Sequence, residues 1–268
     1  MHRAVTLAPD QTLADAKNAM IRYNISRIVV ERKGKPLGIV TEKDIARFLY
    51  EQAQSRNMDE IRLDEVMSSN LIGVRPDSRL GSCAKLMIDN KISSLIVVDA
   101  KGRLQGILTK NDLTEAYVEY YSLRHRVREF MTQKVFSVAP DEPVHAAIML
   151  LTANQIGRVV VSKNDKPVGI VTSKDLLPLG AYFYSGDEFR HRRNARPYIP
   201  SGIVNRVQVS DVMTPDPVVV EQNSDLADAA YIMVRRRISG LPVTGARGVL
   251  AGIVTKTDVV KALAHSAA

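Results

Sequence analysis

A hydroxyl side chain and a carboxylate recur together four times along this chain, always three residues apart and always after a glycine. The shared string is Gly-Ile-Val/Leu-Thr-x-x-Asp, and its copies are Gly38–Asp44, Gly106–Asp112, Gly169–Asp175 and Gly252–Asp258. Thr followed three residues later by an acidic side chain is close to the capping box of a helix N-terminus. A capping box adds roughly 0.5 to 2 kcal/mol of stability and needs no ligand, so it explains any single copy.

Four copies that all carry Asp favour a binding role beyond capping, because a capping box prefers Glu or Gln at its third position. The exposed N–H groups at a helix N-terminus attract phosphate, and a hydroxyl there adds a donor. A carboxylate beside them repels phosphate but accepts hydrogen bonds from the two vicinal hydroxyls of a ribose. The shared glycine lets another group approach the backbone closely. The pattern therefore suits a nucleoside phosphate better than inorganic phosphate.

The residues around each string indicate the elements that must position it. Apolar residues at i, i+3 and i+7 precede the string, as in Leu13, Ala16 and Met20, and predict one face of an amphipathic helix. A β-branched run such as 28–30 follows and predicts a buried strand. A turn then leads into the Gly-Ile-Val/Leu-Thr strand, and apolar periodicity resumes after each Asp. We therefore expect a mixed α/β (α+β) fold of four units, each ordered strand, helix, strand, strand, helix.

The four copies also predict the domain organisation. Their Thr residues are separated by 68, 63 and 83 residues, so the third gap carries an insertion. Units of about 60 residues are individually marginal, so we expect them to pack in pairs. Repeats 2, 3 and 4 begin with a lead-in segment, Val-Met-Ser, Phe-Met-Thr or Val-Met-Thr, whereas repeat 1 begins at its first strand. The expected domains are residues 1–124 (repeats 1–60 and 61–124) and residues 125–268 (repeats 125–182 and 208–268, insertion 183–207).

Composition limits the classes of protein to consider. A net charge of +8 raises the chance of a polyanionic partner, and no run of about 18 apolar residues or signal peptide is present. We therefore expect a cytoplasmic protein without a membrane segment. The single cysteine, Cys83, falls at a core-facing helix position, which predicts a small buried hydrophobe and excludes a disulfide framework or a cysteine metal cluster.

The insertion mixes aromatic and basic side chains. From 186 to 207 it holds five Arg against Asp187 and Glu188, a local charge of +3. One interpretation is a helix extension followed by a solvated loop. The others are a basic flap that contacts phosphates or an acidic partner, and a nucleic-acid contact.

Taken together, the string and the lead-in resemble the CBS domain, the regulatory repeat named after cystathionine beta-synthase, over essentially all of residues 1–265 apart from the insertion. The resemblance implies two pairs of repeats, or Bateman modules, whose clefts bind AMP, ADP, ATP or S-adenosylmethionine. It implies three roles, with ribose bound by the carboxylates, phosphate near the hydroxyls and adenine flanked by the isoleucines. The residues are Asp44, Asp112, Asp175 and Asp258; Thr41, Thr109, Thr172 and Thr255; and Ile39, Ile107, Ile170 and Ile253.

The family also implies phosphate contacts from a two-residue position just after the first helix. This position reads Ser26-Arg27, Ser93-Ser94, Gly157-Arg158 and Ser239-Gly240, so each pair of repeats keeps one arginine. Since such proteins borrow phosphate contacts from the partner repeat, we expect Arg27 to serve Asp112 and Arg158 to serve Asp258, with Ser26, Ser93 and Ser239 nearby. The alternative is that both arginines are exposed charges at a strand edge.

Catalysis is not expected, because the repeats and the insertion occupy the whole sequence. The five histidines have no metal spacing and no Ser or Cys partner in register, so neither a metal site nor a catalytic residue is predicted. We expect a regulatory protein that senses an adenosyl ligand, forms a homodimer and acts on another protein. The alternative is a nucleic-acid-binding or scaffold protein that uses the Arg-rich insertion at 186–207.

Overall fold

The computed structural model describes residues 2–42, 44–45, 57–154, 156–172, 175 and 207–266. The expected insertion, apart from Val207, and the closing helices expected beyond Ile45 and Asp175 lie outside these residues. The chain divides into two compact units, Met1–Leu113 with Leu263–Ala268, and Thr114–Ala262. This division falls within the last helix of repeat 2 and of repeat 4, whereas the sequence predicted a boundary at 124/125, which stays a prediction.

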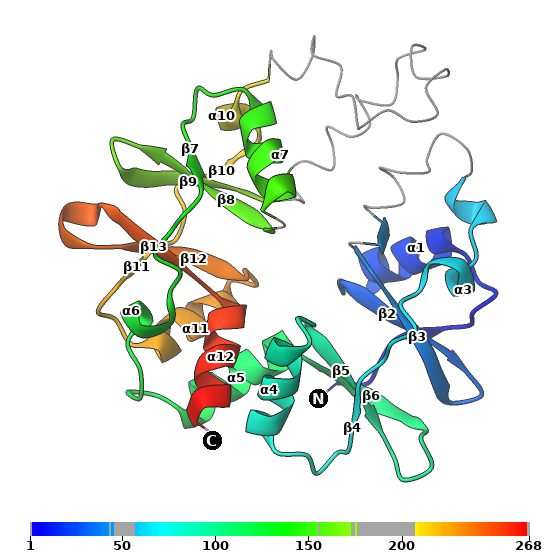
Figure 1. The fold of residues 1–268 in the computed structure, drawn as a ribbon. Coiled ribbons are helices and arrows are strands. Elements are labelled where there is room, and N and C mark those ends of the chain that lie inside the picture. Colours follow the sequence, from blue (N-terminus) through cyan, green and yellow to red (C-terminus); the bar gives the residue numbers. More distant parts are fainter. Residues whose placement is uncertain are drawn as a thin grey trace. The chain divides into compact units, whose positions relative to one another are not determined.

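Repeats 1 and 2, which contribute most of the first unit, show the predicted order of elements (Figure 1). Repeat 1 consists of β1 (Thr6–Leu7), α1 (Leu13–Tyr23), β2 (Arg27–Arg32) and β3 (Lys35–Thr41). Repeat 2 consists of β4 (Gly73–Val74), α4 (Leu80–Asp89), β5 (Ser94–Val98), β6 (Leu104–Thr109) and α5 (Lys110–Tyr120), preceded by η1 (Met58–Glu60) and α3 (Leu63–Val66).

The second unit holds repeats 3 and 4, which follow the same plan. Repeat 3 consists of α6 (Val127–Phe130), β7 (Ser137–Val138), α7 (Val144–Ala153), β8 (Arg158–Lys163) and β9 (Lys166–Thr172). Repeat 4 consists of α10 (Val209–Val212), β10 (Thr214–Pro215), β11 (Val220–Glu221), α11 (Leu226–Arg235), β12 (Gly240–Thr244), η3 (Ala246–Gly248), β13 (Leu250–Thr255) and α12 (Lys256–Ser266).

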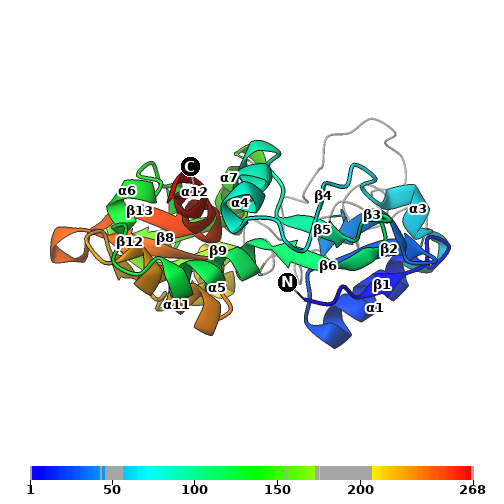
Figure 2. The ribbon, with the colours of Figure 1, turned by 90° about the horizontal axis from the view of Figure 1, so that it is seen from below.

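Each repeat builds one small sheet in which the first strand runs parallel to the second and the second pairs antiparallel with the third. The orders are β1-β2-β3, β4-β5-β6, β11-β12-β13 and β10-β9-β8-β7. The helix after the first strand packs against the second strand (Figures 1 and 2). The sheets therefore place every Thr of the string at the end of a third strand, and α5 and α12 begin directly after Thr109 and Thr255.

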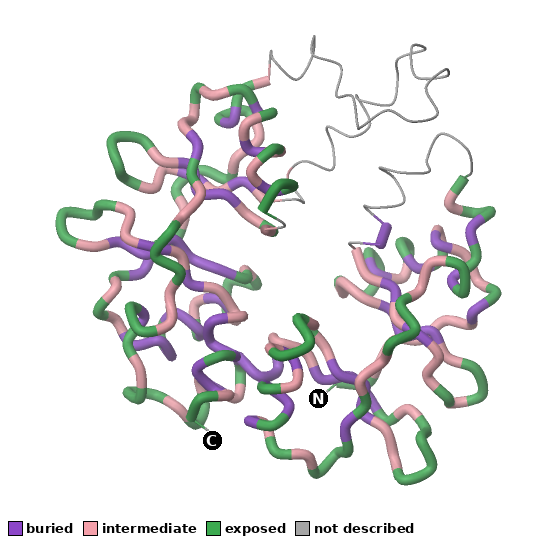
Figure 3. Tube along the Cα trace, in the orientation of Figure 1, coloured by how far each residue is buried: buried purple, intermediate pink, exposed green. Residues whose placement is uncertain are grey.

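The apolar periodicity predicted from the sequence marks the core. Leu13, Ala16 and Met20 of α1 are buried and pack against the first sheet. Cys83 of α4 is likewise buried, which raises the pKa of its thiol and confirms its assignment as a core residue. Figure 3 shows the same division along the chain, with buried residues on the strands and exposed residues at the hairpin turns.

The lead-in segments pair with the sheet of the partner repeat and so join the repeats two by two. In the first unit, Ser68 of repeat 2 forms a bridge with Ile39 of repeat 1, through N–H···O bonds of 2.9 and 3.0 Å. In the second unit, the lead-in of repeat 3 bridges to repeat 4 at Thr132 and Ile253, and β10 of repeat 4 pairs with β9 of repeat 3. Each pair of repeats therefore exchanges its lead-ins.

The prediction that repeat 1 lacks a lead-in is wrong in part. His2 forms with Ile107 the bridge that Ser68 forms with Ile39, with backbone bonds of 3.2 and 3.1 Å. The sequence could not show this lead-in of repeat 1, because the hydrogen bonds of a bridge are formed by the backbone and do not require particular side chains.

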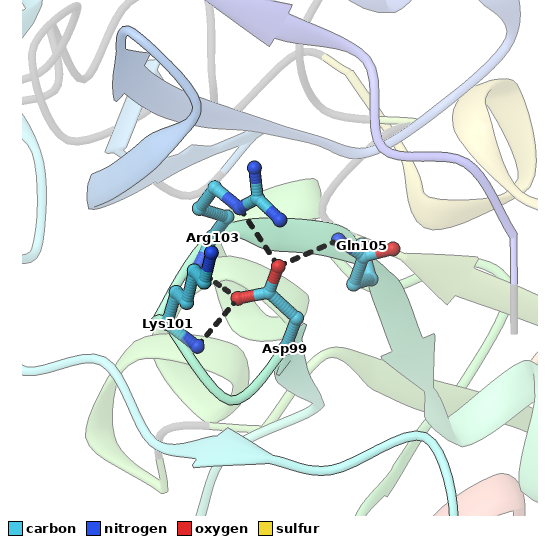
Figure 4. Close-up of polar contacts among 4 residues, drawn as sticks. All are labelled: Asp99, Lys101, Arg103 and Gln105. Atoms are coloured by element: carbon cyan, nitrogen blue, oxygen red, sulfur yellow. Dashed lines mark hydrogen bonds and ion pairs between the residues drawn. The ribbon is translucent and has the colours of Figure 1, made fainter.

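The β5–β6 hairpin turns around the carboxylate of Asp99 (Figure 4). Its Oδ1 accepts the amides of Lys101 and Arg103 at 2.8 and 2.9 Å, and its Oδ2 accepts Nε of Arg103 at 2.8 Å. The backbone and side chain of Arg103 hold the pKa of Asp99 below its ordinary value of 3.8. The turn residue is thus fixed by bonds that require the ionised carboxylate.

We expect Asp99→Asn to destabilise the first unit slightly and to remove a pH dependence. Because the folded state lowers the pKa of Asp99, its contribution is complete above the ordinary value of 3.8 and is lost as the pH falls below it. Chemical unfolding at pH 7 and pH 3 measures the effect. Wild type and variant should differ at pH 7 and converge at pH 3, and a difference that grows toward low pH would contradict this assignment.

Candidate functional site

All four Thr-x-x-Asp strings adopt the same geometry at the end of the third strand of their repeat, and in repeats 2 and 4 the helices α5 and α12 begin directly after the Thr. In each, one carboxylate oxygen, Oδ2 of the Asp, accepts both the backbone amide and the hydroxyl of the Thr. The pairs of N···O and Oγ1···O distances are 2.8 and 2.7 Å at Asp44, 2.6 and 2.6 Å at Asp112, 2.7 and 2.7 Å at Asp175, and 2.9 and 2.7 Å at Asp258. Every copy therefore contains the carboxylate half of a capping box, and at Asp112, in the first turn of α5, the amide also donates to the hydroxyl of Thr109 at 3.4 Å.

Capping by Oδ2 leaves the other carboxylate oxygen turned to different partners. Oδ1 of Asp112 lies 2.8 Å from Nε2 of His2, and Oδ1 of Asp258 lies 2.8 Å from Nζ of Lys261. Asp112 is 8% exposed and Asp258 is 2% exposed. A carboxylate oxygen has two lone pairs, so each Oδ1 can accept a further hydroxyl proton.

The hydroxyls of the string face a constraint that the sequence did not reveal. Each Thr hydroxyl carries one proton and donates it to the Asp beside it, at 2.6 to 2.7 Å. In this arrangement the hydroxyl can only accept further hydrogen bonds. The expected donation from Thr41, Thr109, Thr172 or Thr255 to a phosphate therefore requires the Thr–Asp bond to break.

Arg27 of repeat 1 reaches across to repeat 2. Its Nη1 donates to the carbonyl of Ser93 at 3.0 Å and to the hydroxyl of Ser93 at 3.1 Å, while its Nη2 donates to the hydroxyl of Ser26 at 3.1 Å. Burial lowers the pKa of Arg27, and the negative charges of Glu42 and Asp112 raise it. The guanidinium thus lies within electrostatic reach of the carboxylate with which the sequence paired it.

Arg158 of repeat 3 makes the corresponding crossing in the second unit. Its Nη2 donates to the hydroxyl of Ser239 at 2.5 Å, and a Cβ placed on Gly240 would come within 2.0 Å of its Nη1. Burial lowers the pKa of Arg158, and the charge of Asp258 raises it. The two arginines are therefore not solitary charges at a strand edge, because each contacts the partner repeat.

We call these clusters the Asp112 site, with Thr109, Asp112, Arg27 and Ser93, and the Asp258 site, with Thr255, Asp258, Arg158 and Ser239. For the other two strings, the positions that match Arg27 and Arg158 are Ser94 and Gly240, which carry no guanidinium. Ile107 is buried, and Ile39, Ile170 and Ile253 are partly buried; all four form the bridges to the lead-ins described above.

The family model of the CBS domain matches four segments, residues 1–51, 63–119, 127–180 and 209–265. The chain belongs to the CBS domain family. Each match lies within one of the four repeats predicted from the string, which confirms both the resemblance and the repeat number. The CBS repeats pair as 1 with 2 and 3 with 4, in the manner of two Bateman modules.

Relatives share this organisation over the whole chain. Protein MJ1225 of Methanocaldococcus jannaschii is 24% identical over 276 residues, which cover 97% of this chain and 95% of that protein. Its crystal structure superposes with a TM-score of 0.74 over 97% of this chain and 96% of that one, and an uncharacterized protein of Pyrococcus horikoshii superposes with 0.68 over 98% and 96%, both at 23% identity. These two likenesses establish the fold of the four CBS repeats.

A third relative matches only part of the chain. The CBS domain-containing protein CBSX1 of Arabidopsis thaliana, a chloroplastic protein, is 37% identical over 153 residues, covering 52% of this chain and 64% of that protein. None of the helices that the structure describes is both long enough and apolar enough to span a bilayer.

The CBS structure corrects the interpretation of the shared glycine. At three of the four copies, the group that approaches the glycine is a methionine from the lead-in of the partner repeat. A Cβ would lie 2.4 Å from Sδ of Met67 at Gly38, 2.5 Å from Sδ of Met213 at Gly169 and 2.8 Å from Sδ of Met131 at Gly252. The glycine therefore serves the pairing of CBS repeats.

Sequence reasoning missed four polar residues at the two sites. His2 and Lys261 contact the carboxylates, the charge of Glu42 acts on Arg27, and the charge of Arg158 acts on Lys256. Glu42 and Lys256 each follow the Thr of a string, so comparing that position among the CBS repeats could have found them. His2 and Lys261 gave no such signal, because their contacts depend on the exchange of lead-ins and on an i, i+3 position within α12.

Proposed function

We propose that the protein is a non-catalytic regulatory protein that binds an adenosyl ligand at the Asp112 and Asp258 sites. The ligands meant are AMP, ADP, ATP and S-adenosylmethionine, and the protein serves as a metabolite or energy sensor. The observation that carries the proposal is the crossing of Arg27 toward Asp112 and of Arg158 toward Asp258. Membership of the CBS domain family supports the choice of an adenosyl ligand.

The chemistry of each site fits the two polar ends of a nucleotide. Oδ1 of the carboxylate accepts a ribose hydroxyl, and the guanidinium donates to a phosphate through charge-assisted bonds. Placing both groups at the junction of two repeats couples binding to the way in which the repeats pack. A ligand that contacts both repeats shifts the equilibrium toward the arrangement that it binds better. The protein acted upon and the expected homodimer stay predictions.

Isothermal titration calorimetry with AMP, ADP, ATP and S-adenosylmethionine tests the proposal. At least one of them should bind, and at a hundred times its Kd it should stabilise the folded protein by about 2.7 kcal/mol. Arg27→Met and Arg158→Met should each remove one class of sites, because each variant loses one phosphate donor while the Thr–Asp cap stays intact. Arg235→Met is the control, since Arg235 stacks over the ring of Tyr231 on α11.

The outcomes separate binding from general charge effects. Loss of a class of sites in both cross-repeat variants, with the Arg235 variant unchanged, supports the proposal. Failure of all four ligands to bind the wild-type protein would overturn it. Equal weakening in all three arginine variants would show that net charge, and not these sites, attracts the nucleotide.

A further inference from the structure

The two cross-repeat arginines are held in different ways. Arg27 contacts equivalent serines of both repeats, Ser26 through Nε and Nη2 at 3.4 and 3.1 Å, and Ser93 through Nη1 at 3.0 and 3.1 Å. Carboxylates of both repeats also act on it, Glu42 of repeat 1 and Asp112 of repeat 2. Arg27 therefore interacts with residues of both repeats of its module and is not committed to the Asp112 site alone.

Among the described residues, the side-chain hydrogen bond of Arg158 goes to the partner repeat, at Ser239. The residue that corresponds to Ser26 is Gly157, which offers no hydroxyl, and the guanidinium lies toward Ser239 and over Gly240. Among the described residues, Asp258 of the partner repeat is the carboxylate whose charge acts on it. Arg158 is thus directed to the Asp258 site alone.

A second cation joins Arg158. The amide of Lys256 donates to the carbonyl of Ser239 at 3.2 Å, and the hydroxyl of the same serine accepts from Arg158. Burial lowers the pKa of Lys256, Glu115 raises it, and the charge of Arg158 lowers it, so the two cations lie within electrostatic reach of each other.

The position of the acid that acts on Arg27 is neutral in the second module. Glu42 follows Thr41 in repeat 1, and the corresponding residue of repeat 3 is Ser173, a neutral side chain whose placement lies outside the described residues. Lys110 and Lys256 occupy the same position in repeats 2 and 4, so lysine itself does not distinguish the two sites. The difference comes from Glu42 and from the pair Ser26 and Gly157.

We propose that the two modules select adenosyl ligands by charge, the Asp258 site taking a nucleoside di- or triphosphate and the Asp112 site taking a ligand with at most one phosphate. This inference rests on the proposed function and adds the ligand class of each site. Each further phosphate brings negative charge toward the cations, and in a partly buried site that interaction is stronger than in bulk water. In the first module, the negative charge of Glu42 weakens the attraction between Arg27 and further phosphates. The hydrogen bonds from Arg27 to Ser26 also keep part of the guanidinium on the side of repeat 1.

Reciprocal exchange of two small residues tests the inference. Gly157→Ser gives Arg158 the tether that Arg27 has, and it should fit without strain because a Cβ there meets no atom within 4 Å. Ser26→Gly and Glu42→Gln release Arg27. Calorimetry with AMP, ADP and ATP should be run in the Arg27→Met background to isolate the Asp258 site and in the Arg158→Met background to isolate the Asp112 site.

We expect the Asp258 site to prefer ADP or ATP over AMP and the Asp112 site not to. Gly157→Ser should reduce the preference of the Asp258 site about tenfold, the change that accompanies loss of one charge-assisted hydrogen bond. Glu42→Gln with Ser26→Gly should raise ADP and ATP affinity at the Asp112 site. Lys256→Gln should also reduce the preference at the Asp258 site, whereas Lys166→Gln, at the exposed first residue of β9 in the same module, should not.

Binding of nucleotides at both sites with equal preference for AMP, ADP and ATP would overturn the charge selection while leaving the proposed function in place. An unchanged preference in Gly157→Ser and Lys256→Gln would do the same. If no adenosyl ligand bound either site, the proposed function would fall, and this inference with it.

Discussion

Gly38→Ala is expected to destabilise the first unit by about 1–3 kcal/mol, the range found when a methyl group is forced into a filled space. The added Cβ would lie 2.4 Å from Sδ, 2.6 Å from Cγ and 2.9 Å from Cβ of Met67. The tip of a methionine can move aside, but its Cβ moves only with the backbone. That backbone leads directly into the bridge between Ser68 and Ile39, so the strain falls on the exchange of lead-ins.

Urea unfolding of the wild type and three variants measures this effect. Met67→Ala in the Gly38→Ala background should recover part of the loss, because it removes the atoms that the new methyl group meets. Gly157→Ala is the matched control, since a Cβ there meets nothing within 4 Å, and it should be neutral or slightly stabilising. Equal stability of Gly38→Ala and Gly157→Ala would show that the methionine contact is not tight.

The sequence predicted the elements well because each repeat restates the same local rules. Apolar positions such as Leu13, Ala16 and Met20 fell on the buried face of a helix in the place predicted for them. The string also marked the ends of the third strands, since in every copy the Asp accepts the backbone amide of the Thr. These elements could be predicted from one sequence because the local preferences of the residues agree with the overall fold.

The exchange of lead-ins could not be predicted in the same way. It consists of backbone bonds between segments far apart in sequence, such as Ser68 with Ile39, and of a methionine placed against a glycine. The sequence showed that Gly38 and Met67 recur, but gave no reason to join them. Without that link, the glycine was assigned to ligand approach, which the structure corrects.

The sequence predicted which arginine and which carboxylate belong to each candidate site, but it did not predict their hydrogen bonds. Pairing Arg27 with Asp112 followed from the repeat register, and the structure places them within electrostatic reach. The sequence could not show that Ser26 and Ser93 share the guanidinium, since that depends on two helix-to-strand turns meeting across the repeats. Hydrogen-bond sharing of this kind is a property of the packed pair of repeats.

Asp258→Ala is expected to have two separable effects, one on stability and one on ligand binding. Oδ2 of Asp258 accepts the amide of Thr255 at 2.9 Å and its hydroxyl at 2.7 Å, and Oδ1 accepts Nζ of Lys261 at 2.8 Å. The carboxylate is 2% exposed, so its removal leaves these donors without their partner where water has little access. Unfolding free energy should fall by about 1–3 kcal/mol.

A second capping box in the chain serves as the control for this variant. At the start of α1, Oδ2 of Asp15 accepts the amide of Thr12 at 2.9 Å and its hydroxyl at 3.0 Å, the same bonds in an exposed setting. Asp15→Ala should cost about 0.5–2 kcal/mol, the range for loss of a cap.

Thermal unfolding with and without a saturating adenine nucleotide then distinguishes a cap from a ligand contact. Asp15→Ala should lower Tm while keeping the rise in Tm that nucleotide produces in the wild type. Asp258→Ala should lower Tm further and lose the part of that rise due to the Asp258 site, because no carboxylate remains to accept the ribose hydroxyls. If the two variants kept the same nucleotide-induced rise, Asp258 would be a helix cap like Asp15, and the ligand would have to be held by the arginine and the backbone amides alone.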